Sequence, residues 1–426
     1  MIDLRLLREN LETMKKNILN RHVEADAELT LKLYEEKNQL QTQLEALRKE
    51  RNETADKMKS CPADERPALI EQGKELKEQI ARQEENLNTL SARLQEEAMK
   101  LPNYAHPDAP LGTQDEDNKE LRIVGKPRTF DFTPKDHVQL AEELDLVDFE
   151  AGARVSGAKF YFLKNQAVLM EAALIRYALD ILMKHGFTLY QTPDIAREEI
   201  LLGIGFQPRG AESNIYPLEG TGTCLVGTAE ITLGGYHADQ IIDLEQPILM
   251  GGVSHCFRRE AGSAGQFSKG LYRVHQFTKV EMFVFCRPDE SEAWHEKLRE
   301  IEEEIFTNLE IPYRLVDICV GTLGGPAYRK YDLEAWMPGR GESGDWGEVT
   351  STSNCTDFQA RRLNIRFKDS DGKNKIVHTL NGTAIAISRA LVAIMENFQE
   401  KDGSIRMPKV LQPYLGFDCI PSKGLA

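Results

Sequence analysis

The sequence lacks a long apolar run. No window of about 20 consecutive residues is apolar throughout, so we expect no membrane-spanning helix and no membrane partner. Residues 1–20 form a charged mixture in which Leu4, Leu7 and Leu11 share one helical face. They contain neither an apolar core nor a small-residue cleavage site, so we expect no secretory signal. The many acidic residues also argue against a transit peptide.

Cysteine is sparse and unpatterned. The seven cysteines are odd in number, scattered along the chain and never spaced as CxxC. This pattern favours neither a disulfide framework nor a zinc site, and we expect no zinc. It is typical of a reducing compartment, most simply the cytoplasm, where we expect this protein to reside.

Positive charge is in deficit. Lys and Arg total 53 against 68 Asp and Glu, which gives a formal net charge of -15. Nucleic-acid binding usually leaves a basic footprint, so the net charge by itself does not favour such a partner, although a local basic patch remains compatible with one. The 426 residues, 41% of them hydrophobic, suffice for two domains and at least one large core.

Two apolar ladders with alternating steps of four and three residues lie between residues 29 and 100. The first comprises Leu33, Lys37, Leu40, Leu44, Leu47, Arg51, Thr54 and Met58, and the second Leu69, Gly73, Leu76, Ile80, Gln83, Leu87, Leu90 and Leu94. This spacing indicates a coiled-coil seam. Pro62 and Pro67 break the helix between the ladders. We therefore predict an antiparallel helical hairpin; an intermolecular dimerisation zipper is the alternative interpretation.

A stretch rich in Pro, Gly and acidic residues, 101–118, follows the hairpin and indicates a domain boundary. We expect an N-terminal helical domain over residues 1–105 and a second domain over 106–426. In the second domain, residues 166–185 predict a helix that Gly186 ends. Its predicted apolar face consists of Leu169, Ala173, Tyr177 and Ile181.

Several strands of the second domain follow one another without crossover helices. Strands are predicted over residues 187–195, broken by Pro193, and over 275–285. Near residue 378 a further strand is expected to end in an Asn-Gly turn at Asn381, before an amphipathic helix. This order favours an α+β fold with a mostly antiparallel sheet flanked by helices.

The stretch "CFRREAGSAGQFSKGLYRVHQF", residues 256–277, predicts a hairpin with two adjacent arginines at its mouth. Arg258 lies beside Glu260, and a guanidinium group can donate two parallel hydrogen bonds to a phosphate. The Gly- and Ser-rich loop permits close approach of the backbone to a ligand, and Phe277 could stack on a base. A surface hairpin held by salt bridges is the alternative interpretation.

Four more positions carry chemistry-bearing side chains. In "GTAEITLGG", Thr228 and Glu230 would share one face of a strand and suit a ligand with an ammonium and a hydroxyl group; a solvated strand face is the alternative. Glu281 lies mid-strand among apolar residues, where a carboxylate is costly unless it binds something. Arg389 on an apolar helix requires an anion, either a structural carboxylate or a ligand phosphate.

The stretch "GEVTSTSNCTDFQARR", residues 347–362, is too polar for a core strand. Glu348 and Ser351 could supply hard oxygen ligands for Mg²⁺, which prefers a carboxylate together with substrate phosphates. A plain loop is the alternative interpretation.

Taken in order, these motifs resemble those of the class II aminoacyl-tRNA synthetases. "GFTLYQTPDI" resembles the first motif of the class, with Pro193 at a dimer interface; "FRREAGSAG" with "GLYRVHQFTKVE" resembles the second, and "NGTAIAISRALVAIMEN" the third. The "TAE" triplet, "YRKYDLEAWMP" and "EVTSTSNCTDFQARRLNIRF" resemble segments particular to the seryl-tRNA synthetase family. The N-terminal hairpin resembles the tRNA-binding arm of that family, so the resemblance covers essentially the whole chain.

The resemblance implies an ATP-dependent serine–tRNA ligase that forms seryl-adenylate and then charges tRNA(Ser), and tRNA(Sec) where one exists. It implies a cytoplasmic homodimer with tRNA bound across the subunits. The implied catalytic residues are Arg258, Arg389 and Glu348, with Mg²⁺ held by Glu348 and Ser351. The implied ATP-binding residues are Arg258, Arg259, Glu260, Val274, Phe277, Glu348, Val349, Thr350, Ser351 and Arg389. The implied serine-binding residues are Thr228, Ala229, Glu230, Arg258, Glu281, Asn381 and Thr383.

Within this resemblance, Arg258 holds the α-phosphate and the serine carboxylate, and Arg389 takes the γ-phosphate. Glu281 is the expected partner of the serine hydroxyl. Two alternatives remain: a ligase that loads a carrier protein, whose members lack the helical arm, and a catalytically inactive RNA-binding paralogue. Thr322 departs from the family pattern, which usually has Asp there. On the arm, Arg48, Lys49, Arg51, Arg82 and Arg93 are the candidate tRNA contacts.

Overall fold

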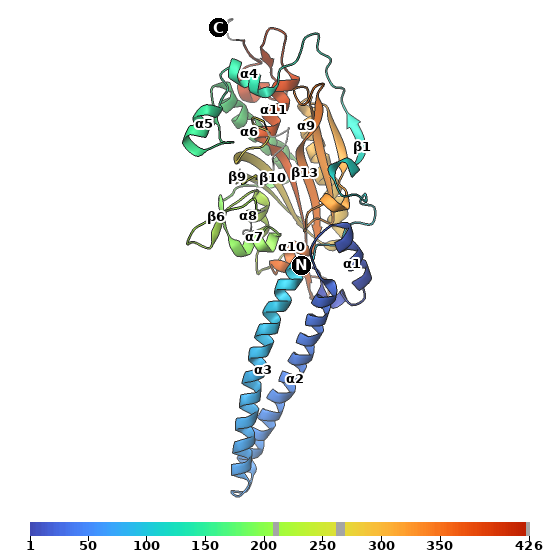
Figure 1. Cartoon of the computed structure of the whole chain (residues 1–426), viewed down its shortest axis with the longest axis vertical. Coiled ribbons are helices and arrows are strands. Elements are labelled where there is room, and N and C mark those ends of the chain that lie inside the picture. The colour runs from blue at the N-terminus through green and yellow to red at the C-terminus, as the bar shows by residue number, and fades with distance from the viewer. Residues whose placement is uncertain (208–212, 261–268, 423–426) are drawn as a thin grey trace. The chain divides into compact units, whose positions relative to one another are not determined.

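The computed structural model describes residues 1–207, 213–260 and 269–422. The chain forms two compact units, Met1–Tyr104 and Ala105–Ala426 (Figure 1). Most of the Gly- and Ser-rich loop singled out in the sequence, residues 261–268, lies outside the described residues. No helix among the described residues combines the length and the apolar character that crossing a membrane requires.

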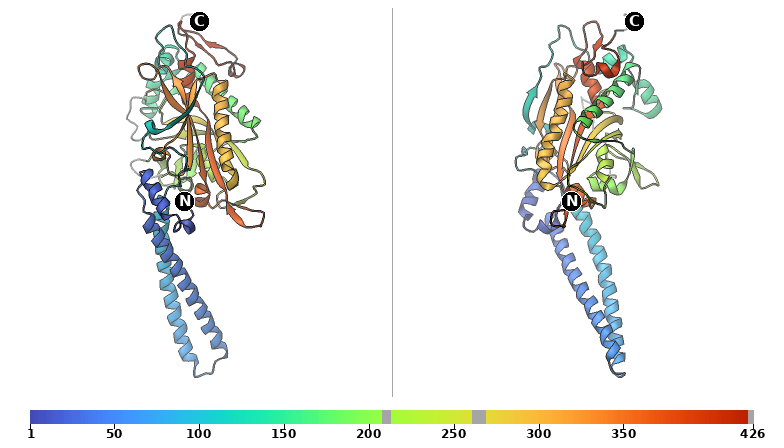
Figure 2. Two further views of the ribbon diagram at one scale, coloured as in Figure 1. Left: turned by 90° about the vertical axis from the view of Figure 1, so that its right-hand side faces the viewer. Right: turned by 180° about the vertical axis from the view of Figure 1, so that it is seen from behind.

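The first unit is helical and contains a long antiparallel hairpin, as predicted. Its elements are η1 (Leu4–Leu6), α1 (Leu11–Asn20), α2 (Ala27–Ser60) and α3 (Arg66–Lys100). Helices α2 and α3 run side by side along their length (Figures 1 and 2). Leu33 and Leu44 on α2 are buried, as are Leu76, Ile80 and Leu94 on α3. The two predicted ladders therefore supply the apolar seam of the hairpin.

Local chemistry accounts for the start of α2 and for the turn between α2 and α3. Asp26 caps the start of α2, where its carboxylate accepts a hydrogen bond from the Leu29 N–H at 2.9 Å. Helix α2 ends at Ser60, two residues before Pro62, and Pro67 lies in the first turn of α3. Proline fits the first turn of a helix because that position needs no intrahelical N–H bond.

The second unit is built on an eight-stranded sheet with the strand order β1-β11-β12-β13-β16-β10-β9-β4. Every neighbouring pair is antiparallel except β4 with β9, which confirms the predicted mostly antiparallel sheet. In sheet order the strands are Lys119–Val124, Tyr313–Asp317, Arg329–Met337, Asp345–Thr356, His378–Ala386, Gln276–Cys286, Ile248–Phe257 and Thr188–Gln191.

Helices surround this sheet. They are α4 (His137–Glu143), α5 (Phe149–Ser156), α6 (Gln166–Lys184), α7 (Glu198–Ile204), α8 (Ala229–Gly235), α9 (Ser291–Asn308), α10 (Phe358–Arg362), α11 (Ile387–Asn397) and α12 (Gln412–Leu415). Figure 2 shows α9 lying along the sheet. Residues of α6, α9 and α11 form one buried apolar cluster with residues of the central strands. The long helices thus bury the sheet and hold its central strands, which carry the site described below.

Short elements complete the unit. The short strands are β2 (Val147–Asp148), β3 (Phe162–Leu163), β5 (Ile195–Arg197), β6 (Tyr216–Leu218), β7 (Thr223–Leu225), β8 (Ile241–Ile242), β14 (Arg366–Lys368), β15 (Asn374–Ile376), β17 (Ile405–Arg406) and β18 (Cys419–Ile420). The 3₁₀ helices are η2 (Asp115–Asp117), η3 (Pro288–Glu290) and η4 (Val320–Thr322). Pro193 separates β4 from β5, as predicted.

The predicted Asn-Gly turn is wrong. Strand β16 runs without interruption through Asn381 and Gly382 to Ala386. Both residues pair on each side, with β10 and with β13, so their backbone is fully engaged in the sheet. A β-carbon at position 382 would lie 3.0 Å from Glu302 Oε1 and 3.1 Å from Thr352 Oγ1. The glycine therefore serves close packing and not a turn.

The "TAE" segment is not a strand, contrary to the prediction. Thr228 is the N-cap of α8, and its hydroxyl accepts a hydrogen bond from the Glu230 N–H at 3.2 Å. Ala229 and Glu230 belong to the first turn of that helix. This hydrogen bond satisfies an N–H group of the first helical turn, which favours a helix over a strand in this segment.

The polar stretch 347–362 includes most of a central strand, although its polarity argued against one. Strand β13 covers Asp345–Thr356 and pairs with β12 and β16. Its buried hydroxyls are satisfied: Thr350 donates to Glu302 at 2.8 Å, and Thr352 donates to the Asn381 carbonyl at 3.0 Å. Hydrogen bonding of this kind makes buried polar side chains tolerable.

The predicted apolar face of α6 is displaced by one residue at its start. Ala173 and Tyr177 are buried as expected, but Leu169 is 51% exposed and Met170 is buried in its place. The sequence pattern did not separate these neighbours because both are large and apolar.

Candidate functional site

A cavity of about 430 Å³ opens in the second unit above the central strands. Its walls come from β10, β12, β13 and β16, with contributions from α8, from the start of α11 and from the segments that follow α7, β9 and η4. Every residue that the resemblance assigned to ATP or serine lines this cavity except Arg259 and Ala229. Segments far apart in sequence therefore converge on one site.

Arg258 is held at the end of strand β9. Its N–H donates to the His275 carbonyl at 2.9 Å, and its Nε donates to the Gly227 carbonyl at 3.2 Å. Its guanidinium carbon lies 5.2 Å from the centre of the Phe277 ring, a cation–π geometry. Held in this way, Arg258 lines the cavity. Arg258 can therefore donate paired hydrogen bonds to an anionic ligand.

A buried triad lies on one side of the cavity. Lys279 and Glu281 form an ion pair on β10. Thr228 donates to Glu281 at 3.0 Å and accepts from Lys279 Nζ at 2.9 Å. The three side chains thus balance one positive and one negative charge around a hydroxyl. Such a preformed polar cluster can accommodate a small polar ligand that exchanges hydrogen bonds with it.

Glu230 is the second carboxylate of this region. Its Oε1 accepts hydrogen bonds from Gln359 at 2.7 Å and from Asn381 at 2.9 Å. Gln359 is itself held by Thr379, whose hydroxyl donates to it at 2.7 Å. Burial and the neighbouring Glu281 charge raise the pKa of Glu230 to about 7. A positively charged ligand group would be attracted here and would favour the ionised form.

Glu348 and Arg389 also line the cavity and contact each other. Arg389 Nη1 donates to the Glu348 carbonyl at 2.9 Å and lies 3.3 Å from Glu348 Oε1. The Arg389 guanidinium carbon also lies 4.8 Å from the centre of the Tyr272 ring. Burial raises the pKa of Glu348, but the positive charges of Arg389, Lys330 and Arg258 outweigh it, and the pKa falls to about 2. Glu348 is therefore a fixed negative charge beside a fixed positive one.

A β-bulge aims Glu348 and Ser351 into the same cavity. The register between β12 and β13 pairs Leu333 with Thr350 but Glu334 with Glu348, so Val349 is the extra residue. In a regular strand, residues three apart point to opposite faces. An extra residue shifts that alternation by one, which brings both side chains to one face.

The Glu348–Ser351 pair fits a magnesium ion that also binds substrate phosphates. Mg²⁺ uses one or two carboxylates and keeps its remaining positions for phosphate or water. The low pKa of Glu348 keeps this carboxylate ionised. Asp332 lies opposite Ser351 in the register, and its Oδ1 is buried without a hydrogen-bond partner. Burial raises the pKa of Asp332 to about 7, with Lys330 opposing and Glu348 adding to the increase.

The remaining assigned residues lie in the wall of the cavity or, for Arg259 and Ala229, outside it. Glu260 has a positive φ of 48° and binds Arg273 at 3.2 Å. Val274, Val349, Thr350 and Thr383 are buried, and Phe277 is partly exposed. Arg259 is exposed, and its N–H donates to the Asn214 carbonyl at 2.9 Å. Ala229 is buried at the start of α8.

The motif-based selection missed several polar residues of this region, and four of them matter most for the site. Lys279 and Lys330 line the cavity, Tyr272 contacts Arg389, and Gln359 orients Glu230. Lys279 precedes Glu281 by two residues on a strand, so alternation alone could have placed both on one face. Gln359 offered no local signal, because its helix reaches Glu230 only through the tertiary fold.

Three of the four candidate tRNA-contacting arginines of the first unit are engaged with neighbouring acids or amides. Arg48 binds Glu84 on the other helix of the hairpin at 2.7 Å, and Arg82 lies 3.7 Å from Glu78. Arg51 donates to the Asn52 side chain at 3.2 Å. All of these pairs are solvent-exposed, so a phosphate can compete with them at little cost.

Comparison with known families matches both units. The family described as "Seryl-tRNA synthetase N-terminal domain" matches residues 1–105. The family described as "tRNA synthetase class II core domain (G, H, P, S and T)" matches residues 219–398. A protein named serine–tRNA ligase from Treponema denticola is 62% identical over 422 residues, which cover 99% of this chain and 100% of the relative. Its namesake from Borrelia recurrentis is 55% identical over 424 residues, with 99% and 100% covered.

Solved structures agree with this match. The crystal structure of seryl-tRNA synthetase from Pyrococcus horikoshii, complexed with ATP, superposes with a TM-score of 0.91 at 43% identity and covers 99% of this chain and 100% of its own. The cytoplasmic serine–tRNA ligase from Naegleria fowleri, in complex with AMP, superposes with a TM-score of 0.88 at 30% identity and covers 100% and 99%.

Proposed function

Because the chain belongs to the seryl-tRNA synthetase family, we propose that it activates serine with ATP and transfers the seryl group to tRNA(Ser). The observation that carries this proposal is that Arg258 and Arg389 line the same cavity as Glu230, Glu281 and Glu348. Fixed cations suit the phosphates, and fixed carboxylates suit the serine ammonium and hydroxyl groups.

The first step is an in-line displacement at the α-phosphorus of ATP. One serine carboxylate oxygen bonds to the phosphorus as the bond to the bridging oxygen of pyrophosphate breaks, and seryl-adenylate and pyrophosphate result. No side-chain nucleophile is required. Arg258 would bind the α-phosphate and the serine carboxylate together, which positions the reactants and offsets the developing charge. Arg389 would bind the γ-phosphate from the Glu348 side.

Magnesium is proposed at Glu348 and Ser351. The ion would neutralise phosphate charge and orient the leaving pyrophosphate when bound. The ionised Glu348 carboxylate and the bulge at Val349 support this assignment. The adenine would lie between Phe277 and the backbone of Val274, with Glu260 as a polar contact, while Val349 and Thr350 line the nucleotide site.

Serine is proposed to bind at the triad of Thr228, Lys279 and Glu281. Glu281 would accept a hydrogen bond from the serine hydroxyl, and Glu230 would contact the ammonium with Asn381 and Thr383 close by. Alanine would leave the buried carboxylate without that bond, which a hydrogen-bonding pocket rejects strongly. Threonine would be excluded by its additional methyl group.

The second step transfers the seryl group from the adenylate to a terminal ribose hydroxyl of the tRNA, with AMP as the leaving group. We assign tRNA(Ser) to the helical arm of α2 and α3, and tRNA(Sec) as a second substrate where one exists. The arm would read the shape and backbone of the RNA, which suits recognition through phosphate and 2′-hydroxyl contacts. Its long, exposed polar surface supports this role.

We also propose that the enzyme is a homodimer with tRNA bound across the subunits. Strand β4 lies at the edge of the main sheet, and α6 exposes Val168, Leu169 and Met183. An unpaired edge beside exposed apolar side chains is typical of an interface. A cytoplasmic location is part of the same proposal, supported by seven cysteines that form no disulfide.

The test is amino-acid-dependent ATP–pyrophosphate exchange with serine, threonine, alanine and glycine. We expect exchange with serine only and loss of exchange in Arg258→Ala. Charging of tRNA(Ser) with radiolabelled serine then tests the transfer step. Exchange with no amino acid would refute the activation step and favour a catalytically inactive RNA-binding protein. Exchange without charging of tRNA would favour the carrier-protein alternative.

A further inference from the structure

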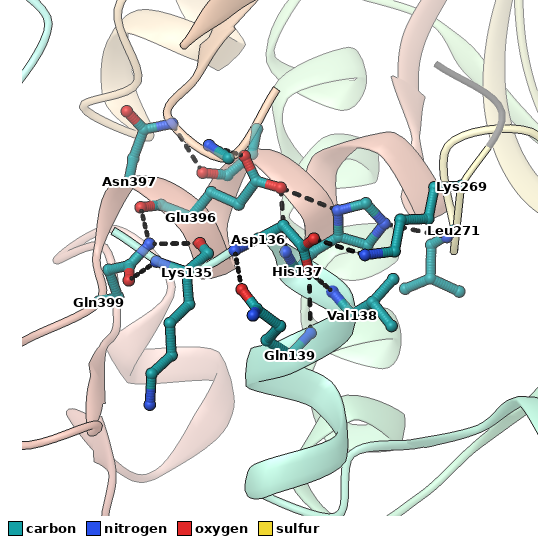
Figure 3. A network of polar contacts seen from close by, with 12 residues as sticks. Lys135, Asp136, His137, Val138, Gln139, Lys269, Leu271, Glu396, Asn397 and Gln399 are labelled. Carbon is teal, nitrogen blue, oxygen red and sulfur yellow. Dashed lines mark hydrogen bonds and ion pairs between the residues drawn. The ribbon is translucent and has the colours of Figure 1, made fainter. Parts of the chain in front are cut away.

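A buried histidine–glutamate pair lies outside the residues assigned above. His137 begins α4 and Glu396 lies in the last turn of α11; they are 6% and 1% exposed (Figure 3). His137 Nδ1 lies 2.8 Å from Glu396 Oε1. The Leu271 N–H donates to His137 Nε2 at 3.2 Å, so Nε2 is the acceptor. We therefore assign the ring proton to Nδ1, which donates it to Glu396.

Glu396 gathers further hydrogen bonds from two separate segments. Its Oε1 also accepts from the His137 backbone N–H at 3.0 Å, and its Oε2 accepts from the Gly339 N–H at 2.8 Å. The pair consequently joins four segments: the start of α4, the end of α11, the connection between β12 and β13, and the C-terminal end of the β9–β10 loop at Leu271. We call this end of the loop, at Leu271 and Tyr272, the loop foot. A carboxylate with several donors of this kind is a strong and geometrically specific anchor.

Two glycines bring the backbone into contact with this pair. Gly270 has a φ of +61°, and a β-carbon there would lie 2.2 Å from His137 Nε2. A β-carbon at Gly339 would lie 2.5 Å from Asp136 Cα and 3.0 Å from the Glu396 side chain. Both segments therefore approach the pair more closely than any other residue type permits. A side chain at either position would push its segment away from the pair.

The pair is connected to Glu348 and Arg389 by two routes, through Tyr272 and along helix α11. Leu271 is followed by Tyr272, whose hydroxyl donates to the Glu348 carbonyl at 3.1 Å and whose ring faces Arg389. Arg389 lies on α11, seven residues before Glu396, so both side chains are on the same side of that helix. Glu396 thus anchors the helix that carries Arg389, and His137 anchors the loop foot that carries Tyr272.

Packing and hydrogen bonds both hold this region, since Leu271 is fully buried in the main apolar cluster and Lys269 donates to Asp136 at 2.7 Å. A small cavity of about 80 Å³ lies between Tyr272, Arg340 and the His137–Glu396 pair. Side chains next to a void lack neighbours on one side and are less restrained by contact. Beside this cavity, the hydrogen bond from the Leu271 N–H to His137 Nε2 ties the loop foot directly to the pair.

We propose that His137 and Glu396 are positioning residues that hold the foot of the β9–β10 loop in register with Arg389 for nucleotide binding. The inference rests on the proposed function, since it names the ATP side of that site. Neither residue touches the substrate. Their effect passes through Leu271 to Tyr272 on one side and along α11 to Arg389 on the other, so it concerns ATP and not serine.

Two isosteric variants separate the two hydrogen bonds of His137. His137→Asn places an amide near the Nδ1 position and keeps a donor for Glu396, but it removes the acceptor for the Leu271 N–H. His137→Gln places an amide near the Nε2 position and keeps that acceptor, but it removes the donor for Glu396. Each variant loses one buried hydrogen bond, so we expect similar decreases in Tm.

The readout is the KM for ATP and the KM for serine in serine-dependent ATP–pyrophosphate exchange. We expect His137→Asn to raise the KM for ATP about fivefold and to leave the KM for serine within about twofold of wild type. His137→Gln, which keeps the contact with Leu271, should raise the KM for ATP less, by about twofold, and should leave the KM for serine unchanged. Lys135→Ala, which removes only the exposed ion pair with Glu143, is the matched control and should match wild type.

Glu396→Gln is a second variant that leaves His137 unchanged. Its amide group cannot accept from every donor that the carboxylate satisfies, so the same ATP-specific rise in KM is expected. Equal KM values for ATP in the Asn and Gln variants, or parallel changes for ATP and serine, would show a purely structural role and overturn the proposal. Wild-type protein without any serine-dependent exchange would instead refute the proposed function, so the two failures are distinguishable.

Discussion

Lys279 and Glu281 form a buried ion pair on strand β10, with their side chains only 7% and 2% exposed. They point the same way because they are two residues apart on a strand. Thr228, the N-cap of α8, bonds to both. The pair therefore fixes α8 against the sheet and at the same time forms the polar floor of the candidate serine pocket. Structure and substrate recognition share these side chains.

Glu281→Gln should destabilise the protein, because it leaves the Lys279 ammonium buried without its counter-ion. Breaking one partner of a buried pair costs about 3–5 kcal/mol of the free energy of unfolding, and the remaining amide should reduce this to about 3 kcal/mol. Urea denaturation measures the change. Arg197→Ala, which removes an ion pair exposed on both sides, is the control and should change stability by less than about 0.5 kcal/mol. If both variants lost the same free energy of unfolding, the Lys279–Glu281 pair would contribute no more to stability than an exposed ion pair.

The KM for serine should depend on pH through Glu230. Burial and Glu281 raise the pKa of Glu230 to about 7, and only its ionised form attracts the serine ammonium. Below pH 7 the carboxyl group is protonated, so we expect the KM for serine to rise as the pH falls from 8 to 6. Initial-rate exchange assays at saturating ATP measure this dependence. Glu230→Gln should raise the KM at pH 8 and flatten the profile; an unchanged profile in that variant would assign the titration to another group.

Arg389→Lys should lower kcat/KM for ATP although the charge is conserved. The lysine ammonium cannot reproduce the two-sided contact of the guanidinium with Glu348 and the Tyr272 ring. We expect a loss on the order of 10²-fold, the size found when one preorganised donor to a developing charge is removed. The KM for serine should change little. A variant with wild-type kinetics would remove Arg389 from the phosphate site.

Two glycine-to-alanine substitutions should have opposite effects on stability. At Gly382 the new β-carbon would lie 3.0 Å from Glu302 Oε1 and 3.1 Å from Thr352 Oγ1, so overpacking should destabilise the second unit by about 1–3 kcal/mol. At Gly73, within α3, no atom lies within 4 Å of the new β-carbon, and helix propensity should stabilise the first unit by about 1 kcal/mol.

Thermal unfolding monitored by circular dichroism at 222 nm, together with aromatic fluorescence of the second unit, measures the two changes. A stabilising Gly382→Ala would mean that β16 can move away from α9. A destabilising Gly73→Ala would mean that the helical hairpin needs a glycine at this position for a reason other than space.

The sequence by itself determined the elements whose signals are local. The heptad ladders and the prolines between them specified the hairpin of α2 and α3, because helix periodicity and helix breaking depend only on neighbouring residues. Apolar runs specified the central strand β10, and the absence of crossover helices specified an antiparallel sheet. The motif order indicated which residues to examine for ATP and serine.

Only the tertiary structure decided where polar segments lie. Strand β13 is polar yet central, because its hydroxyls find partners such as Glu302 on α9. Gly382 looks like part of a turn but lies mid-strand, because Glu302 and Thr352 occupy the space beside it. The orientation of Glu230 by Gln359 and the His137–Glu396 anchor join residues more than one hundred positions apart. No local pattern encodes such pairings, because they exist only when the sheet and its helices are assembled.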